Sequence, residues 1–404
     1  MIGQRTPCLR MADILVVGGG IAGLWMADFA LSVGLSVVLV DAGPIPGAAS
    51  GGLLGALMPH MPDQWNAKKQ FQFDALVDLQ ARLKGLEEQT GLATGYRRSG
   101  RLIPLKNAHQ RALALARQEE ARRRWVGGDR RYEWEVLLPE AARRAVISPA
   151  ASPCGVIRDT LSALVAPRLL LHALNARLTA GARFERLAGR RVVSIMPQTS
   201  RAVLDDRSAV AFGHAVVAAG VASFDMLSRL PGLEGLSLGS PVKGQAARLV
   251  PAAGASGGRL SPDAEIVYDD GVYIVAHADG SVAVGSTSER RFEAGDTTDA
   301  RLDDLIADAR MLCPVLGEMV VAERWAGLRP RAVGRDPMVG PMPDLDNVIA
   351  LTGGFKISFG IAHRMAEAAL SLVTGKKGPA LPESFLPAHH VARARQAADR
   401  LEKG

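Results

Sequence analysis

The sequence contains little cysteine, and this bears on two questions: whether it can form metal or disulfide sites, and in which compartment it works. Its three cysteines, Cys8, Cys154 and Cys313, are far apart among 404 residues. No two of them have the spacing of metal ligands, and an odd number does not build a disulfide framework. We therefore expect reduced thiols, no metal site and a cytoplasmic protein.

Long apolar runs are also missing. No uninterrupted apolar stretch reaches the roughly 18 residues of a membrane span, so we expect no transmembrane segment. Residues 1–11 contain two arginines and no apolar core, which predicts a loose extension and not a secretory signal. No internal repeat is present. With 404 residues and 48% hydrophobic content, the chain is expected to form two domains.

Positive charge is concentrated in one part of the chain. Residues 97–144 contain twelve arginines and one lysine against six acidic residues, an excess of +7 that equals the net charge of the whole chain. With Trp125, Tyr132 and Trp134 interleaved, this segment leaves nucleic acid or an anionic membrane open as a partner. The alternative is a solvated helix face, which the Ala-, Arg- and Glu-rich residues 108–124 favour.

A glycine-rich motif near the N-terminus organises the rest of the chain. Residues 14–17 predict a short buried strand, and residues 21–31 predict a helix. Between and within them, Gly18, Gly20 and Gly23 have the G-x-G-x-x-G spacing. In that motif the glycines permit a tight turn, close approach of a pyrophosphate, and helix-on-strand packing, while the helix N-terminus attracts phosphate.

The context of the motif strengthens this interpretation. A second strand over residues 36–40 ends at Asp41, 21 residues after Gly20, where an acidic residue binds ribose hydroxyls. An ordinary tight strand-to-helix turn remains the alternative. The small-residue loop over residues 43–55 is expected to pack its backbone against something flat.

The rest of the chain alternates short strands and helices. Helices are predicted over residues 70–90, 167–180, 298–312 and 360–372, a hairpin over 96–105 with its turn near Ser99 and Gly100, antiparallel strands over 192–195 and 202–204, parallel strands over 214–220 and 348–352, an antiparallel sheet within 241–288, and an extended polar tail from residue 376.

Six short motifs together resemble the D-amino acid oxidase-like flavoproteins, a family that includes glycine oxidase, sarcosine oxidase and D-amino acid dehydrogenase. They lie at residues 18–23, 49–51, 217–220, 284–287, 326–330 and 353–356. The resemblance implies an α/β fold, in which a Rossmann-type three-layer FAD-binding domain is interleaved with a substrate domain of antiparallel β-sheet plus helices. Its expected boundaries are 12–80, 150–228 and 322–376 for the FAD domain, 81–149 and 229–321 for the substrate domain, and 377–404 for a C-terminal tail.

The resemblance also implies FAD as the cofactor. Residues 314–404 contain no cysteine in the region where sarcosine oxidases attach their flavin, so we expect noncovalent FAD. Main-chain N–H groups of the Gly353 turn would face the flavin C2 carbonyl. The expected cofactor-binding residues are Gly18, Gly20, Gly23, Asp41, Ala42, Ala49, Ser50, Gly220, Gly327, Gly353, Gly354, Phe355, Lys356 and Ile357.

Two cations are the expected substrate ligands. Arg329 matches the glycine oxidase-like arginine that binds the substrate carboxylate, and Lys356 matches the lysine of the sarcosine oxidase Gly-Phe-Lys motif. An arginine fork suits a carboxylate because it binds both oxygens. The pair suits either a substrate with two carboxylates or one carboxylate held twice; a surface salt bridge for Arg329 and a solvent-facing Lys356 are the alternatives. His60 lies in the loop expected near the flavin ring, either lining the site or packing at its rim.

The expected activity is FAD-dependent oxidation of a small carboxylate-bearing amine. Candidates are glycine, sarcosine, an iminodiacetate-type secondary amine or a D-amino acid, oxidised by hydride transfer to flavin N5 to an imine that hydrolyses. The acceptor is O2, giving H2O2, or a quinone or other carrier, because Ala283 replaces a lysine proposed to activate oxygen. The alternatives are a quinone-linked D-amino acid dehydrogenase, a tRNA-modifying flavoprotein acting on a carboxymethylaminomethyl group, or a subunit for electron transfer.

Overall fold

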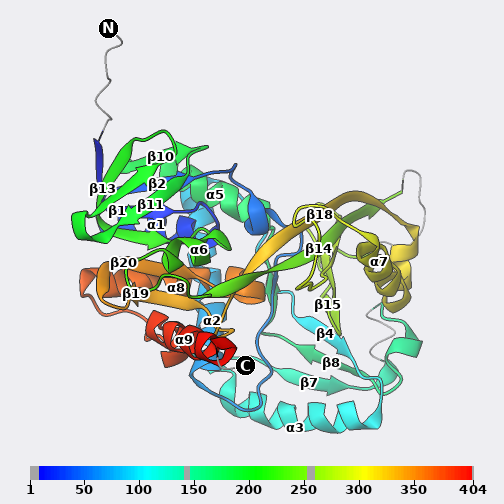
Figure 1. The fold of residues 1–404 in the computed structure, drawn as a ribbon. Coiled ribbons are helices and arrows are strands. Elements are labelled where there is room, and N and C mark those ends of the chain that lie inside the picture. The colour runs from blue at the N-terminus through cyan, green and yellow to red at the C-terminus, as the bar shows by residue number, and fades with distance from the viewer. Residues whose placement is uncertain (1–8, 141–145, 253–259, 403–404) are drawn as a thin grey trace. The chain divides into compact units, whose positions relative to one another are not determined.

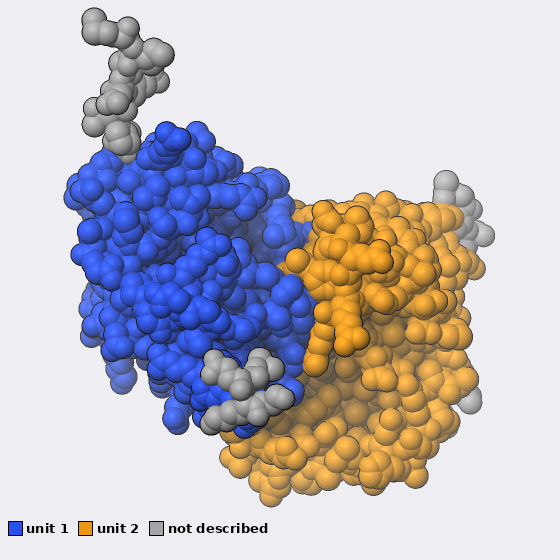
Figure 2. Space-filling view, viewed as in Figure 1, with its two compact units in different colours: residues 1–51, 171–242, 329–404 blue, residues 52–170, 243–328 orange. Residues whose placement is uncertain are grey.

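The computed structural model describes residues 9–140, 146–252 and 260–402, so Cys8 and part of the basic segment lie outside the described residues. The chain divides into two compact units, each assembled from stretches that are distant in sequence (Figure 2). Unit 1 comprises residues 1–51, 171–242 and 329–404, and unit 2 comprises residues 52–170 and 243–328.

A mixed sheet forms the centre of unit 1 (Figure 1). Four neighbouring strands run parallel, and β20 pairs in parallel with the end of β13. The sheet continues through antiparallel neighbours at β12, β11 and β19, as expected for residues 192–204. In sheet order the strands are β10 (Phe184–Ala188), β2 (Val37–Asp41), β1 (Leu9–Val17), β13 (Ala209–Val217), β12 (Arg201–Leu204) and β11 (Val192–Met196); β20 (Leu345–Thr352) pairs with β13, and β19 (Met338–Met342) pairs with β20.

Helices of unit 1 pack on this sheet and on one another. Helix α1 is apolar nearly all round and buries seven of its twelve residues, as a helix enclosed by neighbours does. It contacts α8, where the rings of Trp25 and His363 lie 5.9 Å apart edge to face. The helices are α1 (Ile21–Ser32), most of α5 (Pro167–Thr179), α6 (Ala222–Ser228), α8 (Ser358–Thr374) and α9 (Pro387–Glu402), with 3-10 turns η1 (Ala48–Gly51), η3 (Pro197–Thr199), η5 (Phe355–Ile357) and η6 (Glu383–Phe385).

The expected extended tail is wrong, because α9 occupies most of it. Val391 and Ala394 are three residues apart, which places them on one helix face, and both are 3% exposed in a core shared with Ala332 and Met338. The remaining face is polar. The narrow apolar face of short side chains made this helix look like a solvated segment.

Unit 2 is built on a second sheet of eight strands. Its centre is antiparallel, as expected for residues 241–288, with a parallel pair between β15 and β4. Strands β14 and β18 continue into unit 1. In order the strands are β18 (Met319–Ala332), β14 (Gly239–Pro251), β17 (Val282–Gly285), β16 (Val272–Ala276), β15 (Ile266–Asp269), β4 (Arg101–Pro104), β8 (Val156–Asp159) and β7 (Trp134–Leu137).

Helices and short pairs complete unit 2. Helix α2 is capped by the side chain of Asn66, and α7 by that of Asp299. The elements are α2 (Ala67–Thr90), α3 (Ala108–Arg124) and α7 (Ala300–Leu312), the two-stranded pairs of β3 (Ala56–Leu57) with β9 (Ala163–Leu164) and of β5 (Val126–Gly127) with β6 (Arg130–Arg131), and 3-10 turns η2 (Pro149–Ala151) and η4 (Pro314–Glu318).

The hairpin predicted over residues 96–105 is also wrong. Strand β4 pairs with β8 and β15, both distant in sequence, while Arg97 forms a single bridge to Leu164. A Cβ on Gly100 would lie 2.7 Å from the carbonyl oxygen of Asp159. This glycine permits a close approach of two backbones, a role that a turn-forming glycine resembles in sequence.

The unit boundaries differ from the expected domain boundaries at several places, among them residues 322–328, which belong to unit 2, and residues 377–404, which belong to unit 1. Residues 52–80 belong to unit 2, where the ring of Phe73 packs on Tyr132 and Arg98 donates to the carbonyl oxygen of Leu76. Residues 150–170 also belong to unit 2, whereas residues 229–242 belong to unit 1. The assignment of FAD and substrate binding to particular domains stays a prediction.

Candidate functional site

The glycine turn after β1 has the geometry that its spacing predicts. Gly18 has φ +108°, and a Cβ there would lie 2.5 Å from the carbonyl oxygen of Ala218. A Cβ on Gly23 would lie 1.9 Å from the carbonyl oxygen of Gly18, so α1 presses directly on the turn. Gly20 differs, since a Cβ there would meet only the Ser50 hydroxyl, at 3.2 Å. Gly18 and Gly23 are therefore required by packing, whereas Gly20 presents open backbone to a ligand.

The N-terminus of α1 is prepared for an anion. Gly20 is its N-cap and supplies no side-chain acceptor, and the first turn contains no acidic residue. The Ser50 hydroxyl accepts a hydrogen bond from the N–H of Ile21 at 3.1 Å. The positive end of the helix dipole therefore faces a region without a carboxylate from that first turn, as phosphate-binding helices do.

Asp41 ends β2 with both carboxylate oxygens oriented by the backbone. One oxygen accepts from the N–H of Gly19 and the other from the N–H of Gly43, at 2.7 Å. A carboxylate has about four acceptor positions, so capacity remains for the hydroxyls of a ribose. Ala42 follows directly after Asp41, and Ala49 lies in η1 next to Ser50.

Two further strand ends reach the same edge of the sheet. β13 and β20 run parallel with Val217 opposite Ala350, and the Thr352 hydroxyl donates to the carbonyl oxygen of Gly220 at 3.0 Å. Gly220 has φ +60°, and a Cβ there would meet no atom within 4 Å. The carboxyl ends of β1, β2, β13 and β20 thus gather the predicted glycines, at the edge where open α/β sheets bind ligands.

The turn after β20 leads into α8. Gly353 has φ +77°, and a Cβ there would lie 3.0 Å from the Cβ of Ala332. A Cβ on Gly354 would lie 2.5 Å from the Ser358 hydroxyl. Phe355 also has a positive φ, +49°, and Ile357 is an N-cap without a side-chain cap. This turn therefore needs glycine twice and leaves the first N–H groups of α8 without a side-chain cap from Ile357.

Arg329 and Lys356 form a pair of like charges in unit 1. Arg329 is half-buried on β18, three residues before Ala332, and Lys356 is exposed in η5. Desolvation by the surrounding protein lowers the pKa of Lys356, and the charge of Arg329 lowers it further. Within residues 9–140, 146–252 and 260–402, no carboxylate forms an ion pair with Lys356. The two cations are close enough to repel each other and are suited to share an anion.

His60 and Gly327 belong to unit 2. The N–H and Nδ1 of His60 both contact the side-chain oxygen of Gln72, the former at 2.7 Å, and the Gln72 amide donates to the carbonyl oxygen of Met58 at 3.0 Å. Gln72 is buried, and its side-chain oxygen orients the imidazole with Nδ1 as donor. A Cβ on Gly327 would lie 2.5 Å from the Trp325 ring, which indicates a packing role.

Arginines of the basic segment are largely engaged inside unit 2. Arg97 donates to the carbonyl oxygens of Asp263 and Ala264, and Arg98 donates to that of Leu161 and faces the Tyr132 ring. Further arginines pair with acids or bind carbonyl groups, among them Arg101, Arg111, Arg117, Arg122 and Arg123. These contacts give part of the charge a structural role, whereas Arg122 and Arg123 pair with acids on the exposed face of α3.

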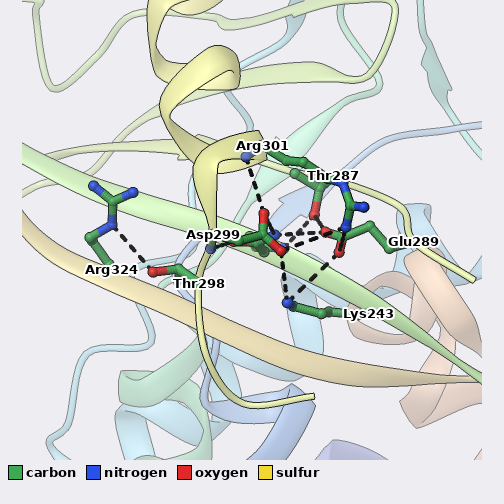
Figure 3. A network of polar contacts seen from close by, with 8 residues as sticks. Lys243, Thr287, Glu289, Thr298, Asp299, Arg301 and Arg324 are labelled. Atoms are coloured by element: carbon green, nitrogen blue, oxygen red, sulfur yellow. Dashed lines mark hydrogen bonds and ion pairs between the residues drawn. The ribbon is translucent and has the colours of Figure 1, made fainter. Parts of the chain in front are cut away.

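A buried polar network in unit 2 was not predicted from sequence (Figure 3). Gln245 donates to Glu289 and to Asp299, each at 2.8 Å, and Lys243 lies 3.2 Å from Asp299. Arg301 donates to Glu289 at 2.7 Å. Its members join β14, the segment after β17 and the start of α7, so the network fixes their arrangement. Only the N-cap position of Asp299 before a helix signals it in sequence.

The sequence profile of the FAD dependent oxidoreductase family, DAO, matches residues 13–368. The chain belongs to this family. Glycine oxidase of Pseudomonas aeruginosa is 28% identical over 388 residues, covering 93% of the chain and 98% of the relative. This confirms the expected family resemblance and the expected α/β class with a Rossmann-type domain, and it makes the protein an FAD-dependent oxidoreductase.

Solved structures show the same fold. Glycine oxidase of Geobacillus kaustophilus superposes with a TM-score of 0.80 at 20% identity, covering 93% of this chain and 98% of that one. Iminodiacetate oxidase of Chelativorans sp. BNC1 gives a TM-score of 0.76 at 19% identity, with the same coverage. Among the described residues, none of the helices is both long and apolar enough to cross a bilayer, and no three His, Cys, Asp or Glu side chains gather as metal ligands.

Proposed function

We propose that this protein oxidises a small amine that carries a carboxylate, and that Arg329 and Lys356 bind the carboxylate. The observation that carries this proposal is the position of Lys356 directly after the Gly353–Gly354 turn, where desolvation lowers its pKa and the charge of Arg329 lowers it further. Two positive charges that repel each other are costly to hold together, and a bound anion offsets that cost. Relatives named glycine oxidase support the amine as substrate.

In this proposal, unit 1 holds FAD at the positions that the sequence predicts. The open face of Gly20 and the N-terminus of α1 would bind the pyrophosphate, Asp41 the ribose, and the Gly353–Gly354 turn the flavin ring. FAD supplies the acceptor for the two electrons and hydrogen removed from the substrate carbon. Since residues 314–404 lack cysteine, we propose noncovalent binding, which acid precipitation tests by releasing yellow flavin into the supernatant.

The cations bind and orient the substrate in this proposal. The planar guanidinium of Arg329 binds both carboxylate oxygens, while the ammonium of Lys356 contributes a point charge. The product is an imine, which water hydrolyses. His60, fixed through Gln72, stays a predicted lining residue whose role no contact in the structure decides.

A substrate with two carboxylates would use each cation once. The fold shared with iminodiacetate oxidase makes an iminodiacetate-type amine a direct candidate beside glycine, sarcosine and D-amino acids. Iminodiacetate and sarcosine differ by one carboxylate. Their comparison therefore distinguishes a site in which both cations bind one carboxylate from a site in which each cation binds its own carboxylate. If each cation binds its own carboxylate, KM is lower for iminodiacetate, and Lys356→Met removes the difference.

The test is an anaerobic mixing experiment with the flavin-loaded protein. Glycine, sarcosine, iminodiacetate and D-alanine are each added while the absorbance of oxidised flavin is followed, with methylamine, dimethylamine and ethylamine as matched amines that lack the carboxylate. At least one carboxylate-bearing amine is expected to bleach the flavin faster than its matched control. Equal bleaching by the controls, or no bleaching by any of the amines, contradicts the proposal.

The electron acceptor follows from the same sample. Admission of air restores the flavin absorbance and forms hydrogen peroxide if O2 is the acceptor. Reoxidation only after addition of a soluble quinone identifies a dehydrogenase, the outcome that Ala283 on β17 favours.

A further inference from the structure

A buried histidine of α9 holds the turn between β18 and β19. His390 is fully buried; its Nε2 lies 3.0 Å from the carbonyl oxygen of Pro337, and its Nδ1 lies 3.3 Å from the backbone nitrogen of Gly334. With Nε2 donating to the carbonyl oxygen of Pro337, Nδ1 accepts a hydrogen bond from the N–H of Gly334, and the ring also has a backbone hydrogen bond with Ser384. A single neutral imidazole thus ties together the two sides of residues 332–337.

The same turn supports the glycine turn after β20. A Cβ on Gly353 would lie 3.0 Å from the Cβ of Ala332, 3.3 Å from the backbone nitrogen of Met338 and 3.4 Å from the carbonyl oxygen of Asp336. In the sheet, Met338 pairs with Thr352, the residue just before Gly353. Any displacement of residues 332–337 therefore acts directly on the backbone that leads to Lys356.

Both cations of the candidate site flank this turn. Arg329 lies three residues before Ala332 on β18, and Lys356 lies three residues after Gly353. Gly334 also shows that the imidazole is closely fitted, because a Cβ at this position would lie 2.9 Å from both Nδ1 and Cε1 of His390. The imidazole is therefore closely packed between the N–H of Gly334, which donates, and the carbonyl oxygen of Pro337, which accepts.

We propose that His390 is a positioning residue that, through residues 332–337, fixes the Gly353–Gly354 turn and the spacing of Arg329 and Lys356. This inference rests on the proposed function for the role of the two cations, and on family membership for FAD. In this proposal α9 supports the Gly353–Gly354 turn through His390. Helix α9 lies outside the residues that match the family.

The test compares substitutions of His390 in the full-length protein. His390→Phe keeps a flat ring but removes both hydrogen bonds, whereas His390→Gln keeps an amide donor for the carbonyl oxygen of Pro337. His172→Phe, on the exposed side of α5, is the matched control. The readouts are the dissociation constant of FAD from fluorescence quenching of the apoprotein, the binding of acetate to the flavin-loaded protein, and the thermal midpoint.

The expected result is about tenfold weaker binding of FAD and of acetate in His390→Phe, consistent with the loss of two hydrogen bonds to backbone groups. His390→Gln is expected to recover part of both losses, and His172→Phe to bind as wild type. If His390→Phe lowers only the thermal midpoint, His390 is merely structural and the inference is wrong. If His390→Phe does not fold, His390→Ala, which removes both hydrogen bonds without adding bulk, decides the question: wild-type FAD and acetate binding in it overturns the inference.

The outcome is separable from that of the proposed function. Weaker FAD binding in His390→Phe supports the positioning role even if no amine reduces the flavin. Conversely, a carboxylate-bearing amine can be oxidised with a KM that Arg329→Ala raises, while substitution of His390 leaves FAD and acetate binding unchanged. In that case the proposed function stands and the inference fails.

Discussion

Desolvation lowers the pKa of Lys356 in η5, and the charge of Arg329 on β18 lowers it further, although 26 positions of the chain separate the two residues. The hydrogen-bonded sheet of unit 1 brings them into range, since β19 and β20 return the chain from the end of β18 to the turn before Lys356. A pair of like charges that is built into the fold gives several measurable consequences.

Loss of either cation is expected to weaken substrate binding. A charge-assisted hydrogen bond contributes about 1.5–3 kcal/mol, so Arg329→Ala and Lys356→Met should each raise KM by about 10- to 100-fold while FAD remains bound. Steady-state kinetics with the amine that bleaches the flavin fastest measure this. Arg324→Ala, whose side chain pairs with Asp303 at 2.8 Å, and Lys84→Met on α2 are the controls. Unchanged KM in both site variants would remove the cations from the substrate site.

Anion binding is expected to weaken as pH rises, and to do so at a lower pH than it would with a lysine of ordinary pKa. The pKa of Lys356 is below its usual 10.5, and a bound carboxylate favours the protonated ammonium, so affinity declines as pH rises through the lowered pKa. Acetate is the appropriate probe because it has no amine of its own to titrate. Its dissociation constant, read from the flavin spectrum, should rise in the wild type and stay flat over the same range in Lys356→Met. A parallel rise in this variant would assign the titration to another group.

Gly20→Ala is expected to separate cofactor binding from folding. Gly20 has φ −73°, which alanine adopts without strain, and the added Cβ meets only the Ser50 hydroxyl. The thermal midpoint of the apoprotein should therefore stay near wild type, while FAD binds at least about tenfold more weakly because the methyl group occupies the pyrophosphate approach. Gly85→Ala, in α2 with open space around it, is the control. Wild-type affinity for FAD in Gly20→Ala would place the pyrophosphate elsewhere.

A buried ion pair in unit 2 is expected to respond asymmetrically to substitution. Arg101 Nε and Asp159 Oδ2 lie 2.6 Å apart, with side chains at most 2% exposed, and Asp159 also accepts from the N–H and hydroxyl of Ser162. Asp159→Ala leaves a buried guanidinium without its partner and should cost about 3–5 kcal/mol of unfolding free energy. The double variant Arg101→Met with Asp159→Ala should recover part of that loss in urea denaturation. If the double variant loses more unfolding free energy than the two single variants lose together, this account is contradicted.

Local rules of backbone geometry explain what the sequence predicted well. The spacing of Gly18, Gly20 and Gly23 follows from contacts within one strand–turn–helix unit, so a short window contains all the information. Asp41 could be placed because the distance from the glycine turn to the second strand end is set by the length of one helix. The antiparallel runs of unit 2 were recognised for a similar reason, since each is a short β-rich stretch bounded by turns.

Contacts between distant segments explain what the sequence did not show. Gly100 looked like a hairpin turn because its actual constraint, the carbonyl oxygen of Asp159, is supplied from a different strand. His390 lies in the segment that was expected to be an extended polar tail, and its partners at Gly334 and Pro337 lie more than 50 positions earlier. Gln72 gave no signal either, because its contacts to Met58 and His60 depend on the path of an irregular loop.

The strand order of unit 1 also dictates when this sheet becomes complete during synthesis. β1 and β13 are direct neighbours although nearly 200 positions separate them, and β20 takes its place beside β13 only after residue 352 has left the ribosome. Such long-range parallel pairing closes large loops and is slow. The sheet of unit 1 therefore becomes complete only when the chain as far as Thr352 is available.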